Sequence, residues 1–459
     1  MKILRNTPFA QLSVGMEAET RRLCVADDLY VFAHASGNFN PLHLASEDGD
    51  GDGLPEAVAP GAWVGSLISA VLGNQLPGPG TVYLSQTHRF LGRAVAGDEL
   101  IAKVRLTGKG DGNRVTFDTW VELADGTRIL DGQAEVIAPT GDISFDSADM
   151  PGLSVRRHKH FDKLLAEAEP LDPMPTAVVA PEEANSLGGA LLAHEHTIIQ
   201  PILIGDSVKI AAAAQELGAD ISGLEVIHVD THRDAAALGV KLVLEGKVQA
   251  LMKGHLHTDD LLRQVMKREG GLRIGRRLSH IFVMDVPGLE HLMFVTDAAI
   301  NIAPDLETKV DIVQNAIDLA RALGIETPKV GVLSAVETVT TKIPSTLDAA
   351  VLSKMADRGQ IRGGMVDGPL AMDNAIDMGA ARTKGIKSMV AGRAEILIAP
   401  NMESGNMLAK ELTFVAHAEA GGIVVGARCP IILTSRSDDD KARLASCAIA
   451  ALYAKRTAL

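Results

Sequence analysis

Apolar residues recur with two different periods along this chain, and the change of period divides it into two regions. Between residues 81 and 139 they alternate with polar residues, as in 100–106, 115–123 and 130–136, and Asp125-Gly126 supplies a turn before the last run. This alternation predicts antiparallel strands with one buried face. From about residue 176 the pattern changes to short, wholly apolar runs separated by helical segments.

A helix precedes the alternating strands of the first region. Its apolar face consists of Trp63, Leu67, Ile68, Val71 and Leu72 at helical spacing. One apolar helix followed by antiparallel strands predicts an α+β domain whose sheet wraps around the helix. We expect this domain to span residues 1–139.

Residues 140–175 lack this periodicity and are predicted to form a linker. The basic run Arg156-Arg157-His158-Lys159-His160 is interpreted as a solvated charged face. Residues 161–168 are predicted to form an amphipathic helix, which the prolines at 170, 173 and 175 end.

The second region, residues 176–459, alternates buried strands with helices. The apolar runs typical of buried strands are 176–180, 202–205, 226–229, 250–252, 281–284, 293–296, 329–333, 394–399 and 422–425. Helical segments such as 234–245 and 259–268 separate them, so we expect a largely parallel sheet covered by helices on both faces. Because about 280 residues is long for one such sheet, we also expect two lobes around a cleft.

Two stretches of this region carry small and polar residues next to strands or helices. Asp367-Gly368-Pro369 is interpreted as a turn that opens a helix. Pro400-Asn401 is expected to end a strand, and Ser404-Gly405-Asn406 lets backbone amides approach a ligand closely. Loops at strand ends are where open α/β sheets bind ligands.

Composition limits the classes of function. The 459 residues carry a formal net charge of -14, which argues against a nucleic-acid partner but leaves room for a local basic site. Cys24, Cys429 and Cys447 are too few for a disulfide framework and lack the spacing of metal ligands. No apolar run approaches ~18 residues and no signal peptide is evident, so we expect a cytoplasmic protein with no membrane partner.

Four motifs of the first region point to a known family. They are Phe32-Ala33-His34-Ala35-Ser36-Gly37-Asn38-Phe39-Asn40-Pro41-Leu42-His43, Gln86-Thr87-His88-Arg89-Phe90, Gly97-Asp98-Glu99-Leu100 and Gly132-Gln133-Ala134-Glu135-Val136. Through these motifs the region resembles the MaoC-type hotdog domain of (R)-specific enoyl-CoA hydratases. In that family an Asp and a His activate a water molecule as general base and acid.

His43 falls on the catalytic His position of this family, whereas Asn38 occupies the position of the Asp. An amide cannot accept a proton near neutral pH, so we expect an impaired hydratase in which Asn38 retains a substrate-binding role. Asp48, Asp50, Asp52 and Gly53 imitate the start of an EF-hand. The twelfth position is Ala59 instead of Glu, so we interpret this stretch as a loop without calcium.

Seven separated motifs of the second region point to another family. They are Lys253-Gly254-His255-Leu256-His257-Thr258, Ser279-His280, Thr296-Asp297-Ala298-Ala299-Ile300-Asn301, Ser334-Ala335-Val336-Glu337, Asp367-Gly368-Pro369, the stretch from Asn401 to Asn406, and Thr434-Ser435-Arg436-Ser437-Asp438. In this order they resemble the phosphate acetyl/butyryltransferase family. The resemblance implies two α/β lobes like those of isocitrate and isopropylmalate dehydrogenases, a homodimer or higher homo-oligomer, and reversible acyl transfer between phosphate and coenzyme A. Its partners are then acyl-CoA, acyl phosphate and phosphate, with coenzyme A as a substrate and no bound cofactor.

The resemblance also assigns site residues. Arg436 offers a planar fork for phosphate, Ser435 a donor to an acyl or phosphate oxygen, and Asp438, Asp439 or Asp440 a base for the thiol. The expected substrate-binding residues are Lys253, Ser279, Asn301, Glu337, Asp367, Asn401, Gly405 and Asn406. The pairs His194/His196 and His255/His257 lack a third ligand at fixed spacing, so no metal is expected.

Three alternatives remain open from the sequence. The chain could be a true bifunctional hydratase and acyltransferase, or its hotdog domain could serve only to bind acyl-CoA or to form oligomers. A dehydrogenase on the same superfold is a third, although G-x-G-x-x-G is absent. The choice between acetyl and butyryl groups depends on packing that the sequence does not reveal.

Overall fold

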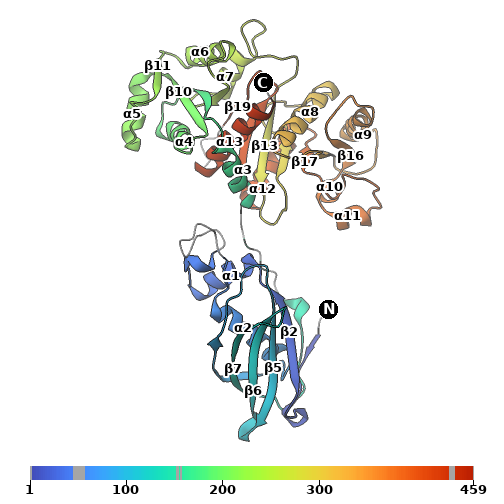
Figure 1. Ribbon diagram of the computed structural model, residues 1–459. Helices are drawn as coiled ribbons and strands as arrows, with labels where there is room; N and C mark the ends of the chain where they lie inside the picture. The colour runs from blue at the N-terminus through green and yellow to red at the C-terminus, as the bar shows by residue number, and fades with distance from the viewer. Residues whose placement is uncertain are drawn as a thin grey trace. The chain divides into compact units, whose positions relative to one another are not determined.

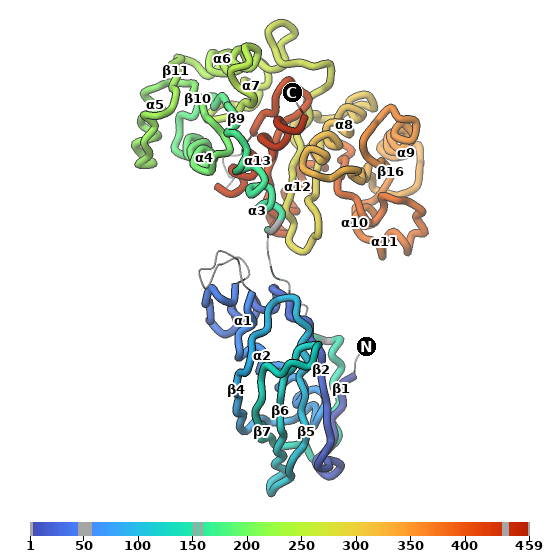
Figure 2. Tube along the Cα trace, in the orientation of Figure 1, coloured from blue at the N-terminus to red at the C-terminus, as the bar shows by residue number. Residues whose placement is uncertain are grey.

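The computed structural model describes residues 3–44, 57–150, 153, 155, 158–433 and 440–457. The chain forms two compact units, Met1–Val155 and Arg156–Leu459, and we describe each by itself (Figures 1 and 2). None of the described helices is both long and apolar enough to cross a membrane. The predicted loop at residues 46–53 lies outside the described residues.

The first unit wraps an antiparallel sheet around helix α2 (Gly61–Asn74), as the sequence predicted (Figure 1). The described strands run in the order β2-β5-β6-β7-β3, and β4 also pairs with β7. All five apolar residues of the predicted helix face are buried. The other elements are β1 (Ile3–Arg5), β2 (Glu17–Leu23), α1 (Ala26–Ser36), β3 (Val82–Gln86), β4 (Arg89–Phe90), β5 (Glu99–Lys109), β6 (Arg114–Leu123), β7 (Arg128–Ile137) and β8 (Ser144–Asp146).

The segment predicted as a linker is largely folded. Strand β8 pairs with β1 in the first unit, and helix α3 (Lys159–Ala168) belongs to the second. Phe161 of α3 is fully buried, and the backbone N–H groups of His160 and Phe161 donate to the Asp285 carboxylate at 2.7 and 2.9 Å. The basic run is therefore not simply a solvated face, because the backbone of His160 at its end is hydrogen-bonded to Asp285 inside the second unit.

The described strands of the second unit form one eleven-stranded sheet, in the order β11-β10-β9-β12-β19-β18-β13-β14-β17-β15-β16. The strands are β9 (Met174–Val179), β10 (Ile199–Gly205), β11 (Glu225–His228), β12 (Ala250–Lys253), β13 (Ser279–Asp285), β14 (Met293–Thr296), β15 (Lys329–Leu333), β16 (Met365–Leu370), β17 (Ile396–Ile398), β18 (Glu419–Val425) and β19 (Ile431–Ile432). The region of about 280 residues is therefore not too long for one sheet, contrary to our expectation.

This sheet consists of two parallel blocks that run in opposite directions. One block contains β11, β10, β9, β12 and β19, and the other contains β14, β17, β15 and β16. Between them, β18 and β13 pair antiparallel with each other and with their outer neighbours. The prediction of a largely parallel sheet holds for each block, but it missed the antiparallel centre.

Helices cover both faces of the sheet, as predicted. They are α4 (Ala184–Glu195), α5 (Ser207–Leu217), α6 (His232–Leu244), α7 (Thr258–Val265), α8 (Leu306–Ala322), α9 (Pro344–Asp357), α10 (Met372–Ile376), α11 (Met378–Thr383), α12 (Met402–Phe414) and α13 (Asp440–Thr457). One face carries a single continuous core under α3, α4, α8 and α13, with α13 lying between the two halves (Figure 2). The other face carries two separate cores, one under α6 and α7 and one under α10 to α12.

The stretch Asp367-Gly368-Pro369 does not form the turn that we predicted. It lies inside β16, at the edge of the sheet, and the helix α10 begins only at Met372. Proline lacks an N–H donor, and an edge strand tolerates this loss because only one of its sides is paired. The composition of a turn was therefore a misleading signal here.

Candidate active site

Five strands, taken from both parallel blocks, have their carboxyl ends at the same height along the sheet. The strand pairings connect a row of residues that crosses seven strands: Met252, Ile432, Ile423, Ile281, Thr296, Ile398 and Val332. Strands β12 and β19 reach this shared row from one direction, and β14, β17 and β15 reach it from the other. The carboxyl ends of strands are where α/β sheets bind ligands, so this geometry gathers the motif-bearing loops of both blocks.

Several of the predicted site residues of the second unit follow this row in the chain. Lys253 comes directly after Met252, and the loops with Asn301, Asn401 and Glu337 follow β14, β17 and β15. The segment 434–439 follows β19, and it contains Ser435, Arg436, Asp438 and Asp439, all of which lie outside the described residues. Among the three candidate bases, Asp440 is described; it begins α13 and lies 3.4 Å from Arg443.

Four of the predicted binding residues lie together where β14 and β17 end. The Asn406 Nδ2 donates to the Ala298 carbonyl at 3.1 Å, and a Cβ at Gly405 would lie 2.4 Å from the Asp297 carbonyl. The Asn401 Oδ1 accepts from the Ser404 N–H at 2.9 Å, which caps α12. Asn301 lies in the neighbouring loop, and its Nδ2 donates to the Leu278 carbonyl at 2.8 Å.

The buried carboxylate of Asp297 organises this loop, a role that our sequence reasoning missed. Asp297 is 2% exposed and accepts from the backbone N–H groups of Ala299, Ile300 and Asn301 at 2.9–3.1 Å. It also accepts from the Asn301 Nδ2. Four donors on one carboxylate hold the loop in a fixed shape, so that Asn301 is oriented before any ligand arrives.

Ser279 does not present its hydroxyl to an open surface. It is 0% exposed, and its Oγ accepts from Asn315 Nδ2 of α8 at 2.9 Å. The expected substrate contact of Ser279 is therefore not supported, and the residue instead links β13 to the helix behind the sheet.

The next residue, His280, is also buried, with 3% of its surface exposed, but it has a ring nitrogen that no described residue partners. Its side chain is on the opposite face to Ser279, because side chains alternate along a strand. Burial lowers the pKa of His280 to about 4, against an opposing effect of Asp297, so the imidazole is neutral near pH 7. Among the described residues Nδ1 has no hydrogen-bond partner, and a Cβ at Gly422 would lie 2.8 Å from Nε2. Of the motif Ser279-His280, we selected Ser279 from the sequence as the binding residue, whereas the unpartnered ring nitrogen belongs to His280.

Lys253 lies among ionisable residues at the carboxyl ends of β9, β10 and β12. Its Nζ donates to the carbonyls of Gly254 and Leu256 at 3.2 and 3.4 Å. Glu182 is close by in the fold: burial acts to raise its pKa, but the Asp206 N–H, His232 and Lys209 together lower it. His255 Nε2 lies 3.0 Å from the Glu183 carboxylate. No group of three or more His, Cys, Asp or Glu suited to a metal ion occurs within the described ranges.

Glu337 and Asp367 differ in their suitability as ligand contacts. Glu337 lies after β15 and pairs with Lys384 at 3.2 Å; its own backbone N–H and this lysine lower its pKa. Asp367 lies within β16, beside Gly331 of β15, and accepts from the Gly368 N–H at 2.8 Å and the Ser353 hydroxyl at 3.5 Å. The structure therefore leaves Glu337 near the shared row and gives Asp367 a supporting role between β16 and α9.

The first unit holds His43 in a defined tautomer. Its Nδ1 lies 2.7 Å from the Val58 carbonyl, which can only accept, so Nδ1 carries the proton of the neutral ring and Nε2 is free to accept. Asn38 is exposed, and its Oδ1 accepts from the Asn40 N–H at 3.3 Å. The hydrogen bond orients the His43 ring, but an amide stands at the position where the family has its base.

Comparisons with known proteins agree with both resemblances. A family model described as Phosphate acetyl/butaryl transferase matches residues 230–451, and a model described as MaoC like domain matches residues 10–125. A phosphate acetyltransferase from Rhizobium meliloti is 57% identical over 296 residues, which is 64% of this chain and 94% of that protein. A phosphate butyryltransferase from Clostridium acetobutylicum is 41% identical over 296 residues, which is 64% of this chain and 98% of that protein.

The structure of a branched-chain phosphotransacylase from Enterococcus faecalis V583 resembles the second unit, with a TM-score of 0.54 at 30% identity over 61% of this chain and 99% of its own. The two resemblances inferred from sequence motifs are thus confirmed. This chain belongs to the phosphate acetyl/butyryltransferase family, and it carries a MaoC-like hotdog domain ahead of its transferase region.

Proposed function

We propose that the second unit transfers an acyl group, acetyl in the first place, between coenzyme A and phosphate. The observation that carries this proposal is the shared row, because it brings together the carboxyl ends of strands from both blocks, and the motif with Ser435 and Arg436 follows one of these strands, β19, in the chain. The identity of 57% to an acetyltransferase, against 41% to a butyryltransferase, favours acetyl over butyryl groups.

In this proposal the segment 434–439 carries the chemistry. Arg436 grips the departing phosphate with two parallel donors, which a planar guanidinium does better than an ammonium group. Ser435 donates to the acyl or phosphate oxygen as charge develops on it. Asp438, or one of its neighbours Asp439 and Asp440, takes the thiol proton of coenzyme A. No bound cofactor or metal takes part in this scheme.

We further propose that the second unit has the two-lobed fold of isocitrate and isopropylmalate dehydrogenases. The two separate cores on one sheet face, one under α6 and α7 and one under α10 to α12, support this interpretation. We retain residues 1–139 and 176–459 as the functional domains. The dehydrogenase alternative gains nothing from the relatives described above, which are acyltransferases, one of them 57% identical over 296 residues.

A homodimer is the proposed assembly. Strand β3 lies at the edge of the hotdog sheet, and Val82, Leu84 and nearby Phe90 are 55%, 40% and 54% exposed. An unpaired edge with apolar side chains favours pairing with a second chain. Sedimentation of the full chain tests this: a monomer at all concentrations would contradict it.

The acyl group is tested by a coupled assay of acyl-phosphate formation over C2 to C6 acyl-CoA substrates. The proposal expects the highest kcat/KM with acetyl-CoA. A maximum at C4 would make the chain a butyryltransferase and would refute the acetyl assignment.

A further inference from the structure

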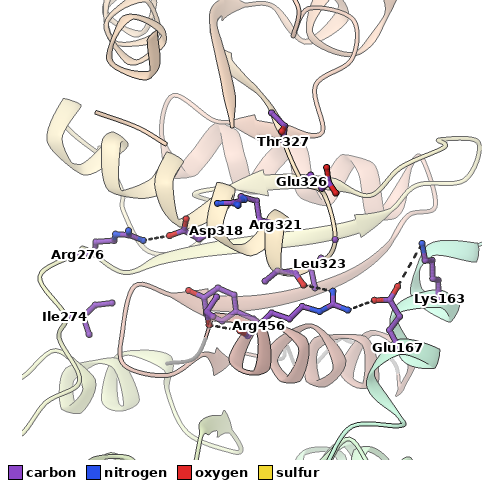
Figure 3. A pocket seen from close by; sticks show the side chains of 14 residues that line it. Lys163, Glu167, Ile274, Arg276, Asp318, Arg321, Leu323, Glu326, Thr327 and Arg456 are labelled. Carbon is purple, nitrogen blue, oxygen red and sulfur yellow. Dashed lines mark hydrogen bonds and ion pairs between the residues drawn. The ribbon is translucent and has the colours of Figure 1, made fainter. Parts of the chain in front are cut away.

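A large cavity lies on the sheet face opposite to His280, away from the loops of the shared row. Its volume is about 1340 Å³, and α3, α8, α13 and the loops before β13 and β15 line it (Figure 3). Its basic residues are Lys163, Arg276, Arg321 and Arg456. Its acidic residues are Glu167, Asp318 and Glu326. A cavity of this size is large enough for a metabolite and much larger than a phosphate ion requires.

The cavity has basic side chains that the protein itself does not neutralise. Two of its three acids are already paired: Asp318 with Arg276 at 2.6 Å, and Glu167 with Arg456 at 2.8 Å (Figure 3). Arg321 has no ion-pair partner among the described residues. Lys163 reaches a carboxylate only at 4.0 Å, on the already paired Glu167. Arg321 and Lys163 therefore outnumber the single remaining acid of the cavity, Glu326. The cavity is locally basic, although the net charge of the protein is -14.

A chain of hydrogen bonds connects this cavity to β13. The Arg276 Nη1 that pairs with Asp318 also lies 3.4 Å from the Asn315 Oδ1. Asn315 is 1% exposed, and its Nδ2 donates to the Ser279 Oγ at 2.9 Å and to the Arg277 carbonyl at 3.0 Å. Ser279 is adjacent to His280, so one buried amide connects Arg276 to the start of β13.

We propose that this cavity binds a small organic or inorganic polyanion, with two or more carboxylate or phosphate groups, and that the bound anion regulates acyl transfer. Arg321 and Lys163 attract the ligand, and the ligand competes with Asp318 for the guanidinium of Arg276. When Arg276 turns toward the ligand, the Asn315 Oδ1 loses the N–H donor of Arg276. The hydrogen bonds from the Asn315 Nδ2 to the Ser279 Oγ and the Arg277 carbonyl then weaken. The regulatory part rests on the proposed function, whereas the binding part does not.

Binding is tested by isothermal titration calorimetry of the full chain with citrate and, separately, with pyrophosphate at constant ionic strength. We expect saturable binding of at least one anion, and a loss of about tenfold or more in affinity for Arg321→Gln. The control Arg358→Gln removes an exposed arginine outside the cavity and should bind normally. Absence of saturation with both anions, or equal losses in the two variants, would overturn the site. Citrate alone or pyrophosphate alone would identify the group that the site accepts.

Regulation is tested by measuring acyl transfer with and without the anion that binds. We expect a several-fold change of rate in the wild type, no change in Arg321→Gln, and, in Arg276→Gln, weaker binding and no change of rate even at saturating anion. An anion effect that persists in Arg321→Gln would mean competition at the active site and would refute the regulatory role. If the wild type transfers no acyl group at all, the proposed function fails, and the calorimetric result still decides the binding site.

Discussion

Asn38→Asp should create or greatly increase enoyl-CoA hydratase activity in the hotdog domain. The substitution replaces an amide, which cannot act as a base near neutral pH, by a carboxylate of almost the same shape. The partner histidine is already in place, because the hydrogen bond between His43 Nδ1 and the Val58 carbonyl fixes the ring. The new carboxylate can keep the contact that the Asn38 Oδ1 makes with the Asn40 N–H at 3.3 Å.

The expected gain follows from the role of the base. General-base catalysis typically contributes ~100–10,000-fold to the rate, so the variant should be distinguishable from the wild type by at least ~100-fold. Because Asn38 is exposed, the substitution should change the free energy of unfolding by only about 0.5 kcal/mol or less. A gain therefore reports on chemistry and not on folding.

The assay is the loss of absorbance of crotonyl-CoA on hydration. Asn40→Asp serves as the control, since Asn40 caps a short 3-10 helix through its Oδ1, and an aspartate there adds the same charge two residues away. Addition of His43→Ala to the Asn38→Asp variant should abolish the gain. Strong hydration by the wild type that His43→Ala abolishes would refute our reasoning and support the bifunctional enzyme.

Three further predictions concern the second unit. Arg436→Lys should lower kcat nearly as much as Arg436→Ala, by ~100–1000-fold, because a point charge cannot replace a two-donor grip; a Lys variant within a few-fold of wild type would contradict this. Deletion of residues 1–155 should leave acyl transfer intact, and a folded, dimeric but inactive fragment would place part of the site in the hotdog unit. The buried His280 should make the second unit less stable in acid. Its pKa of about 4 lies below the ordinary 6.5, so the unfolded state takes the proton first, and stability falls by roughly 3 kcal/mol as the pH drops from 6.5 to 4. In urea unfolding, the free energy of unfolding of His280→Asn should depend less on pH between 6.5 and 4 than that of the wild type. An equal pH dependence of the two proteins would refute the lowered pKa of His280.

The sequence predicted most strands of the second unit because they are buried on both faces and read as short apolar runs. It could not predict their direction, since an apolar run such as 281–284 is the same in parallel and antiparallel pairing. One missed contact depends on a partner far away in the chain. Phe161 is buried in the core of the second unit, and its backbone N–H donates to Asp285, 124 residues away, a contact that no local pattern indicates.

The candidate site was predictable as a set of motifs but not as a set of side-chain roles. Ser279 and His280 are neighbours on opposite faces of the sheet: Ser279 contacts Asn315 of α8, and the His280 ring lies 4.5 Å from the Phe282 ring, centroid to centroid. Which residue faces which side depends on the register of β13, and this register is fixed by β14 and β18. Asp297 was inside a quoted motif, yet its role follows only from the four donors that the folded loop aims at it.

The central claim is that the second unit transfers acyl groups between coenzyme A and phosphate. The most direct test is the phosphate-dependent release of coenzyme A from acetyl-CoA by the full chain, followed through the free thiol. Our account predicts release that saturates with both acetyl-CoA and phosphate and that Arg436→Ala lowers by ~100-fold or more. Release no faster than in phosphate-free buffer, from a folded protein, would contradict it.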